Sequence, residues 1–231
     1  MNKTIFTLTI ILLTSVSFAN ENAYKYKVTG NSLELFGHKL KTNHLPNNQG
    51  DHYVEFSESP DNYNLVILSY LHLQGKYNAW LYNKITKEKP TEINALHAGR
   101  HPQLKWHSNE VFEIAWAGMG YYTAAIYNIS DIDNGIIVND PVIIDPKNNI
   151  YVSYIEDPLE TGLVVNNIFN AQSKGEIFIF ELPEAMSVID RYESISEVFV
   201  KDGKLVIKYN QDGNINEHVF YPTLLNKSSN N

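Results

Sequence analysis

The stretch HAGRHPQLKWHSNEVFEIAWAGMGYY, residues 97–122, contains the clearest β-strand of the chain. From Val111 to Trp116 the side chains alternate between two faces, and Glu113 is the one charged residue among them. This period of two is typical of a strand with one well-buried face. A Gly-Met-Gly turn and a second strand ending at Tyr127 follow. The pattern therefore predicts a β-hairpin over residues 111–127, turning around the glycines.

Further short strands separated by polar turns occupy most of the chain, which predicts an all-β protein. The run Leu65–Leu73 is apolar on both faces, so we expect it in the middle of a covered sheet. One segment, Pro183–Tyr192, has helical spacing, with a twisted outer strand as the alternative. With 43% hydrophobic and 12% aromatic residues, we expect a single domain over residues 20–225 and a disordered tail at 226–231.

The first 19 residues have the composition of a secretory signal peptide: Lys3, the apolar run Ile5–Leu13 and a small-residue end at Ala19. We expect cleavage after Ala19 and no integral membrane segment afterwards, with an N-terminal membrane anchor as the alternative. Cysteine is absent, which excludes disulfides and thiolate metal sites. An exported chain without cysteine fits a bacterial periplasm, or a secreted location.

The formal net charge of the chain is -8, and its basic residues are scattered along the sequence. Such an acidic balance disfavours nucleic acid and anionic membrane surfaces as partners. The charge otherwise serves solubility.

A polar turn followed by a strand recurs along the chain. Turns at positions 62, 109, 148 and 202 are spaced by 47, 39 and 54 residues. A second series relates Trp80–Asn83 to Ala125–Asn128, 45 residues later, with Phe178–Glu181 as a third copy. These spacings are near the length of one β-propeller blade, about 40 to 50 residues with four strands each.

This rhythm of turns and strands resembles the loosely repeated β-propellers of periplasmic proteins, including the propeller domain of the Tol-Pal translocation protein. The resemblance covers most of the chain after residue 20 and implies four or five blades of antiparallel strands. The ring would close where the strand His218–Tyr221 meets the N-terminal strand. The chain has neither a Trp-Asp blade end nor a kelch double glycine, so no functional residue is carried over. A β-sandwich or an irregular barrel is the alternative, because it has the same number of strands.

Two groups of residues suit metal ions. His97, His101 and His107, with Glu110 nearby, offer zinc ligands, and the alternative is a set of histidines that cap turns. Asp131–Gly135 resembles an acidic calcium loop but lacks the distal glutamate, so a simple polar turn is the alternative. We expect no cofactor, with calcium or zinc as the exceptions to test.

Catalytic signatures are weak. A glycosidase on a five-bladed propeller would need two carboxylates across a cavity, and Glu113 is the most notable candidate because it lies in the middle of a strand. No nucleophile elbow and no phosphate-binding glycine loop occurs in the sequence.

Aromatic side chains suit carbohydrate or protein recognition when they are exposed, and strand packing when they are buried. Trp80, Trp106, Tyr121 and Tyr122 are the candidate binding residues. The sequence thus predicts an exported envelope binding or scaffold protein without catalysis, whose partner is an envelope protein or a carbohydrate. A glycan-active hydrolase on the same fold is the alternative, and a metal-dependent protein using the three histidines is a third hypothesis.

Overall fold

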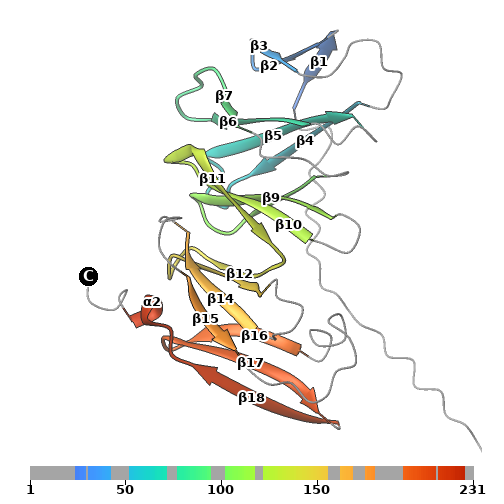
Figure 1. Ribbon diagram of the computed structural model, residues 1–231. Coiled ribbons are helices and arrows are strands. Elements are labelled where there is room, and N and C mark those ends of the chain that lie inside the picture. Colours follow the sequence, from blue (N-terminus) through green and yellow to red (C-terminus); the bar gives the residue numbers. More distant parts are fainter. Residues whose placement is uncertain are drawn as a thin grey trace, which may run out of the picture.

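The computed structural model describes residues 24–29, 31–42, 52–71, 77–94, 102–117, 122–155, 162–168, 175–179, 195–211 and 213–226. Within them, eighteen strands form five antiparallel sheets of three or four strands each. The fold is all-β and propeller-like, as the sequence predicted. The sheets follow one another in chain order from the top of Figure 1 to the bottom. No helix in this part of the chain is long and apolar enough to cross a membrane.

Each sheet is a simple meander in which sequence neighbours pair. Sheet 1 contains β1 (Tyr26–Thr29), β2 (Ser32–Leu35) and β3 (His38–Lys41). Sheet 2 contains β4 (His52–Glu58), β5 (Asn64–Leu71), β6 (Tyr77–Asn83) and β7 (Thr91–Ile93). Sheet 3 contains β8 (Gln103–Trp106), β9 (Val111–Ala117), β10 (Tyr122–Asn128) and β11 (Asp131–Asn139). Sheet 4 contains β12 (Pro141–Asp145), β13 (Ile150–Tyr154), β14 (Gly162–Asn167) and β15 (Glu176–Ile179). Sheet 5 contains β16 (Ile195–Lys201), β17 (Lys204–Gln211) and β18 (Asn214–Phe220), and the short helix α2 (Thr223–Asn226) follows it.

The predicted turn repeat coincides with the boundaries between first and second strands. The turns at 62, 109, 148 and 202 precede β5, β9, β13 and β17, each the second strand of its sheet. Three of these turns hold a polar residue at positive φ: Asn62 at 62°, Asn149 at 56° and Asp202 at 50°. Asn and Asp tolerate this left-handed conformation better than other side chains, which is why polar residues mark the repeat.

The second predicted series is correct for two of its three members. Trp80–Asn83 lies in β6 and Ala125–Asn128 in β10, both third strands of their sheets. Phe178 lies in β15, the fourth strand, so the match to Phe178–Glu181 is wrong. The equivalent strand is β14, whose Asn167 pairs with the start of the second strand just as Asn83 does in sheet 2. It carries Asn166 where the other two carry Tyr82 and Tyr127, which hid the relation.

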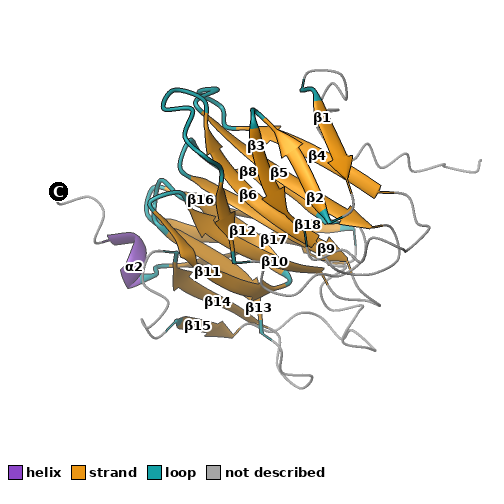
Figure 2. Ribbon diagram, turned by 90° about the horizontal axis from the view of Figure 1, so that it is seen from above, coloured by secondary structure: helices purple, strands orange, loops and turns teal. Residues whose placement is uncertain are grey.

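The hydrophobic core lies between successive sheets, in four clusters that join sheets 1 to 2, 2 to 3, 3 to 4 and 4 to 5. Strand β5 contributes to two of them: Leu65 and Ile67 pack toward sheet 1, and Val66 and Leu68 toward sheet 3. The predicted strand with two buried faces is therefore confirmed over residues 65–70, and residues 72–73 of the predicted run lie outside the described residues. Seen from above, the sheets overlap with their strands inclined in a common direction (Figure 2).

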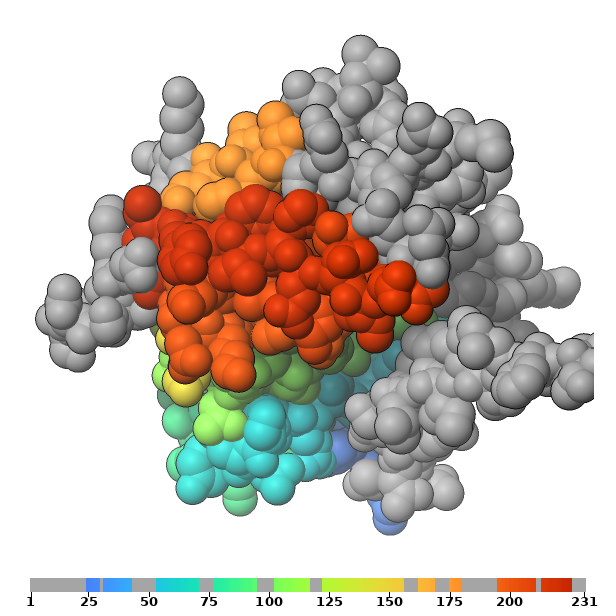
Figure 3. Space-filling model, turned by 90° about the horizontal axis from the view of Figure 1, so that it is seen from below, coloured from blue at the N-terminus to red at the C-terminus, as the bar shows by residue number. Residues whose placement is uncertain are grey.

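The described sheets form an open stack, so the expected closure beside the N-terminal strand is wrong. β18 belongs to sheet 5 and β1 to sheet 1, at opposite ends of the stack in Figure 1. The pairing register places Lys27, Glu34 and Lys39 in one row on the face of sheet 1 that points away from sheet 2. A charged face of this kind stays in water and needs no covering sheet. From below, sheet 5 lies in front, and parts of sheets 2, 3 and 4 are visible beside it (Figure 3).

The hairpin predicted over residues 111–127 is confirmed in its strands, since β9 and β10 pair along their whole length. Its glycine turn and the segment Pro183–Tyr192 lie outside the described residues, as do the predicted signal peptide and residues 227–231 of the predicted tail; Asn226 of that tail is the last residue of α2.

The acidic stretch Asp131–Gly135 lies within β11 and not in the predicted turn, but it interrupts the pairing: Asp131 pairs with Asn128 and the next pair is Ile136 with Ile126. The Asp131 carboxylate accepts a hydrogen bond from the Asn134 side chain at 2.7 Å. Gly135 lies beneath the Tyr127 ring, where a Cβ atom would come within 2.4 Å of a ring carbon. Close approach of an aromatic ring, and not a turn, therefore requires this glycine.

Candidate functional site

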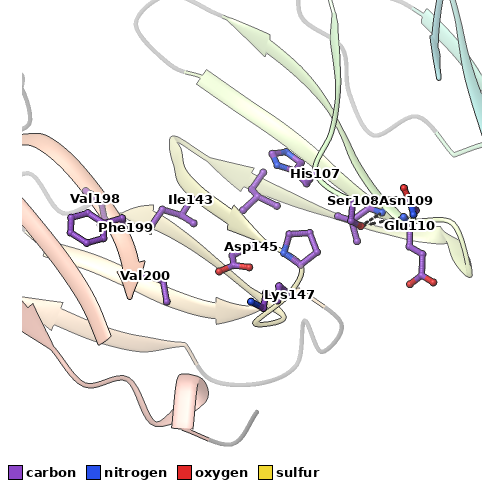
Figure 4. Close-up of a pocket in the computed structure, with 13 residues that line it drawn as sticks. His107, Ser108, Asn109, Glu110, Ile143, Asp145, Lys147, Val198, Phe199 and Val200 are labelled. Carbon is purple, nitrogen blue, oxygen red and sulfur yellow. Dashed lines mark hydrogen bonds between the residues drawn. The ribbon is translucent and has the colours of Figure 1, made fainter. Parts of the chain in front are cut away.

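A cavity of about 690 Å³ lies where sheets 3, 4 and 5 meet. Three short stretches line it: the β8–β9 turn, the end of β12 with the turn after it, and the middle of β16 (Figure 4). The lining residues are His107, Ser108, Asn109, Glu110, Val111, Ile143, Ile144, Asp145, Pro146, Lys147, Val198, Phe199 and Val200. The cavity thus combines an apolar wall with a polar rim.

Hydrogen bonds within the β8–β9 turn fix the shape of the rim. The Ser108 hydroxyl accepts from the backbone N–H of Glu110 at 3.2 Å and from that of Val111 at 3.0 Å. The His107 N–H donates to the Val111 carbonyl at 2.8 Å. A tight turn leaves some backbone N–H groups without a carbonyl acceptor, and the Ser108 hydroxyl accepts from two of them.

Of the two carboxylates at the cavity, Asp145 already has partners. One carboxylate oxygen accepts from the Asn148 backbone N–H at 3.2 Å, and the other accepts from the Asn148 side-chain amide at 2.6 Å. Asp145 therefore holds the β12–β13 turn. Glu110 is exposed and belongs to the rim.

Behind the rim, His107, Glu113 and Tyr122 form a buried polar cluster. The His107 Nε2 atom lies 3.5 Å from a Glu113 carboxylate oxygen, and their side chains are only 9% and 4% exposed. The Tyr122 hydroxyl donates to the other Glu113 oxygen at 3.3 Å. Burial, and then the Glu113 charge, raise the pKa of Tyr122 above its usual value. The cluster keeps a carboxylate inside the protein next to two groups that can donate to it.

This arrangement joins three residues that the sequence analysis named for separate reasons. His107 was a metal candidate, Tyr122 a binding candidate and Glu113 a catalytic candidate. Among the described residues, no group of three or more His, Cys, Asp or Glu side chains lies in a metal-binding arrangement. His97, His101 and Tyr121 lie outside the described residues.

The two tryptophans named as binding residues lie away from the cavity. Trp80 is 2% exposed and packs in the core between sheets 1 and 2, so its ring cannot serve a recognition surface. Its place on a doubly covered sheet explains the burial. The Trp106 indole N–H donates to the Ser57 carbonyl at 3.2 Å, and the centre of the Trp106 ring lies 5.0 Å from the centre of the Phe112 ring. Trp106 thus joins sheet 3 to sheet 2.

Sequence reasoning missed most of the cavity wall, including Ile143, Lys147 and Phe199. One signal was present, because two of the repeated turns, at 109 and next to 148, contribute to the rim. In a stack of similar sheets, equivalent turns lie at the same edge. The strand residues carried no comparable signal.

No family model matches the chain, and no curated protein matches it. Among solved structures, the β-propeller domain of the Trilobed protease from Pyrococcus furiosus, described as having an open velcro topology, is 14% identical with a TM-score of 0.32. The similarity covers 82% of this chain and 73% of that one. A eukaryotic initiation factor is 10% identical with a TM-score of 0.33, over 85% of this chain and 62% of that one. At such low TM-scores neither likeness says anything about function. The fold assignment rests on the five stacked meanders themselves.

Proposed function

We propose that this chain is an exported binding protein of a bacterial envelope, and that its ligand occupies the cavity between sheets 3, 4 and 5. The observation that carries the proposal is the composition of that cavity. About 690 Å³ is the size of a typical ligand pocket, and it offers both apolar side chains and hydrogen-bonding groups. The basic, apolar and small-residue order of residues 1–19 supports export, and the likeness in rhythm to the Tol-Pal propeller supports an envelope role.

Binding agrees better with the carboxylates than hydrolysis does. A glycosidase needs an acid and a base or nucleophile that both face the substrate. At this cavity both oxygens of Asp145 accept hydrogen bonds from Asn148. Glu113 is 3% exposed, with His107 and Tyr122 against its oxygens. Glu110 alone is left, and one exposed carboxylate is insufficient for that chemistry.

The absence of cysteine allows a direct test with a single fluorescent label. Asn109→Cys places an environment-sensitive dye at the rim, on an exposed turn residue. Lys89→Cys, on an exposed loop of sheet 2, is the matched control. Both proteins are titrated with cell-wall oligosaccharides and with short synthetic peptides.

We expect a saturable change in emission at position 109 for one of the two ligand classes, and none at position 89. Equal responses at both positions, or no response to either class, would contradict the proposal. Release of new reducing ends from an oligosaccharide would favour the hydrolase instead.

A further inference from the structure

We infer that the ligand of this cavity is an extended polypeptide segment, which adds as an extra strand to the edge of β16 that no described strand covers. The inference rests on the proposed function and names its ligand class. It follows from the backbone edges of two strands that face the cavity, and not from the lining side chains alone.

Consecutive residues of β16 line the cavity: Val198, Phe199 and Val200. Successive side chains of a strand point to opposite faces of its sheet, so a cavity against one face touches every second residue. Contact with three residues in a row means that the cavity lies along the edge of the strand. β16 is an end strand of sheet 5 and pairs with β17 on its other side. Its cavity edge therefore presents backbone N–H and C=O groups in the plane of the sheet.

β12 presents a second edge to the same cavity, through Ile143, Ile144 and Asp145. It is an end strand of sheet 4, but it starts with a proline and its register slips between Pro141 and Ile143. Proline lacks the N–H that a new strand would need, and a bulge interrupts the spacing of the others. β16 contains no proline, and its register is regular from Glu197 to Lys201. β16 is thus the better template.

The side chains around this edge suit a peptide with alternating apolar residues. Ile143 packs toward sheet 5 and Ile144 toward sheet 3, so apolar contacts are available beside the edge. The rim adds one exposed acid, Glu110, and one exposed base, Lys147. A segment with a charge of each sign near its ends would complement both.

An oligosaccharide fits this wall less well. Sugar recognition favours exposed aromatic faces. Phe199 supplies the phenyl ring of the cavity lining. The Lys208 ammonium lies 4.8 Å from the centre of that ring. One face of Phe199 is therefore covered by a residue of its own sheet.

The test uses heptapeptides with alternating valine and threonine, a lysine at one end and a glutamate at the other, and a fluorophore for anisotropy. Each peptide is compared with two derivatives. One carries N-methyl groups on the amides of the odd-numbered residues, and the other carries them on the amides of the even-numbered residues. In an added strand, one set of amides points toward β16 and the other set points away from it. We expect one derivative to bind about ten-fold more weakly or worse, and the other to stay within about three-fold of the parent.

Asn109→Trp fills the rim and should abolish binding, whereas Glu88→Trp, on an exposed loop of sheet 2, should leave it unchanged. Equal affinities of the two methylated derivatives would overturn strand addition, even if the peptide binds in the cavity. Binding of oligosaccharide with no binding of any peptide would overturn the inference and leave the proposed function standing. A silent label at position 109 toward both classes would overturn both.

Discussion

At the scale of single residues, buried tyrosines dominate the ionisable groups of the core. Burial, and then the neighbouring Tyr127, raise the pKa of Tyr77 above its usual value, and Tyr122 behaves likewise next to Glu113. The native state therefore keeps these protons at a pH where the unfolded chain loses them. The stability that this gives is complete below the unfolded pKa of about 10 and is lost as the pH rises above it.

We predict that the free energy of unfolding falls steadily above about pH 10, and that Tyr77→Phe makes this fall shallower by removing one such proton. Urea unfolding followed by far-UV circular dichroism between neutral and alkaline pH measures the slope. An identical slope in the variant would show that Tyr77 titrates normally.

Gly135 gives a second prediction at this scale. Gly135→Ala should destabilise the protein by about 1–3 kcal/mol, because the new methyl group would overlap the Tyr127 ring. Asp133→Ala, an exposed position on the same strand, is the control and should change stability by less than about 0.5 kcal/mol. Thermal unfolding of both variants decides the matter; equal melting temperatures would mean that the ring moves aside freely.

At the scale of elements, Glu176 of β15 ties the end of the chain to sheet 4. Its carboxylate accepts from the backbone N–H of Thr223 and of Leu224, both at 2.8 Å, and from the Thr223 hydroxyl at 2.6 Å. Glu176 thus supplies acceptors for backbone N–H groups in the first turn of α2, which have no acceptor within the helix. Leu225 of the same helix is 3% exposed and packs in the core between sheets 4 and 5.

Glu176→Gln should therefore cost about 1–2 kcal/mol of stability, since an amide supplies one acceptor oxygen and no charge. Glu92→Gln on β7, an exposed carboxylate of sheet 2, is the matched control. Denaturant melts at neutral pH compare the two; a loss in the control as large as at Glu176 would refute the capping role.

Element type was readable from the sequence where the period of two was clear, as in β9, or where a short run was apolar on both faces, as in β5. It failed at Asp131–Gly135, since Asp, Asn and Gly are the residues that turns also prefer. There a glycine is needed because the Tyr127 ring of the neighbouring strand lies too close for a Cβ atom, and local composition does not reveal that contact.

At the scale of the whole molecule, each described sheet shares a core cluster only with its neighbours along the stack. Such an array should respond to core changes locally. Trp80→Phe in the cluster of sheets 1 and 2 and Ile207→Val in that of sheets 4 and 5 should lower stability additively, within about 0.5 kcal/mol. Chemical denaturation of the two single variants and the double variant measures this. A larger coupling would point to contacts that bring the two ends of the stack together.

The repeat of turns predicted the number of sheets to within one, because each turn marks the start of a second strand. The open ends of the stack could not be predicted from the repeat of turns. They depend on the strand register that places Lys27, Glu34 and Lys39 on one face of sheet 1. The cavity was not readable either, because Glu110, Lys147 and Phe199 come from three different sheets and meet only when the sheets stack.

The most direct test of the account is amide hydrogen exchange, followed by NMR, with and without the alternating valine–threonine peptide. If the segment adds to β16, the cavity-facing amides within Val198–Val200 should gain protection on binding, whereas those of β5 should not change. Binding without any new protection along β16, or with protection elsewhere in the molecule, would contradict the account.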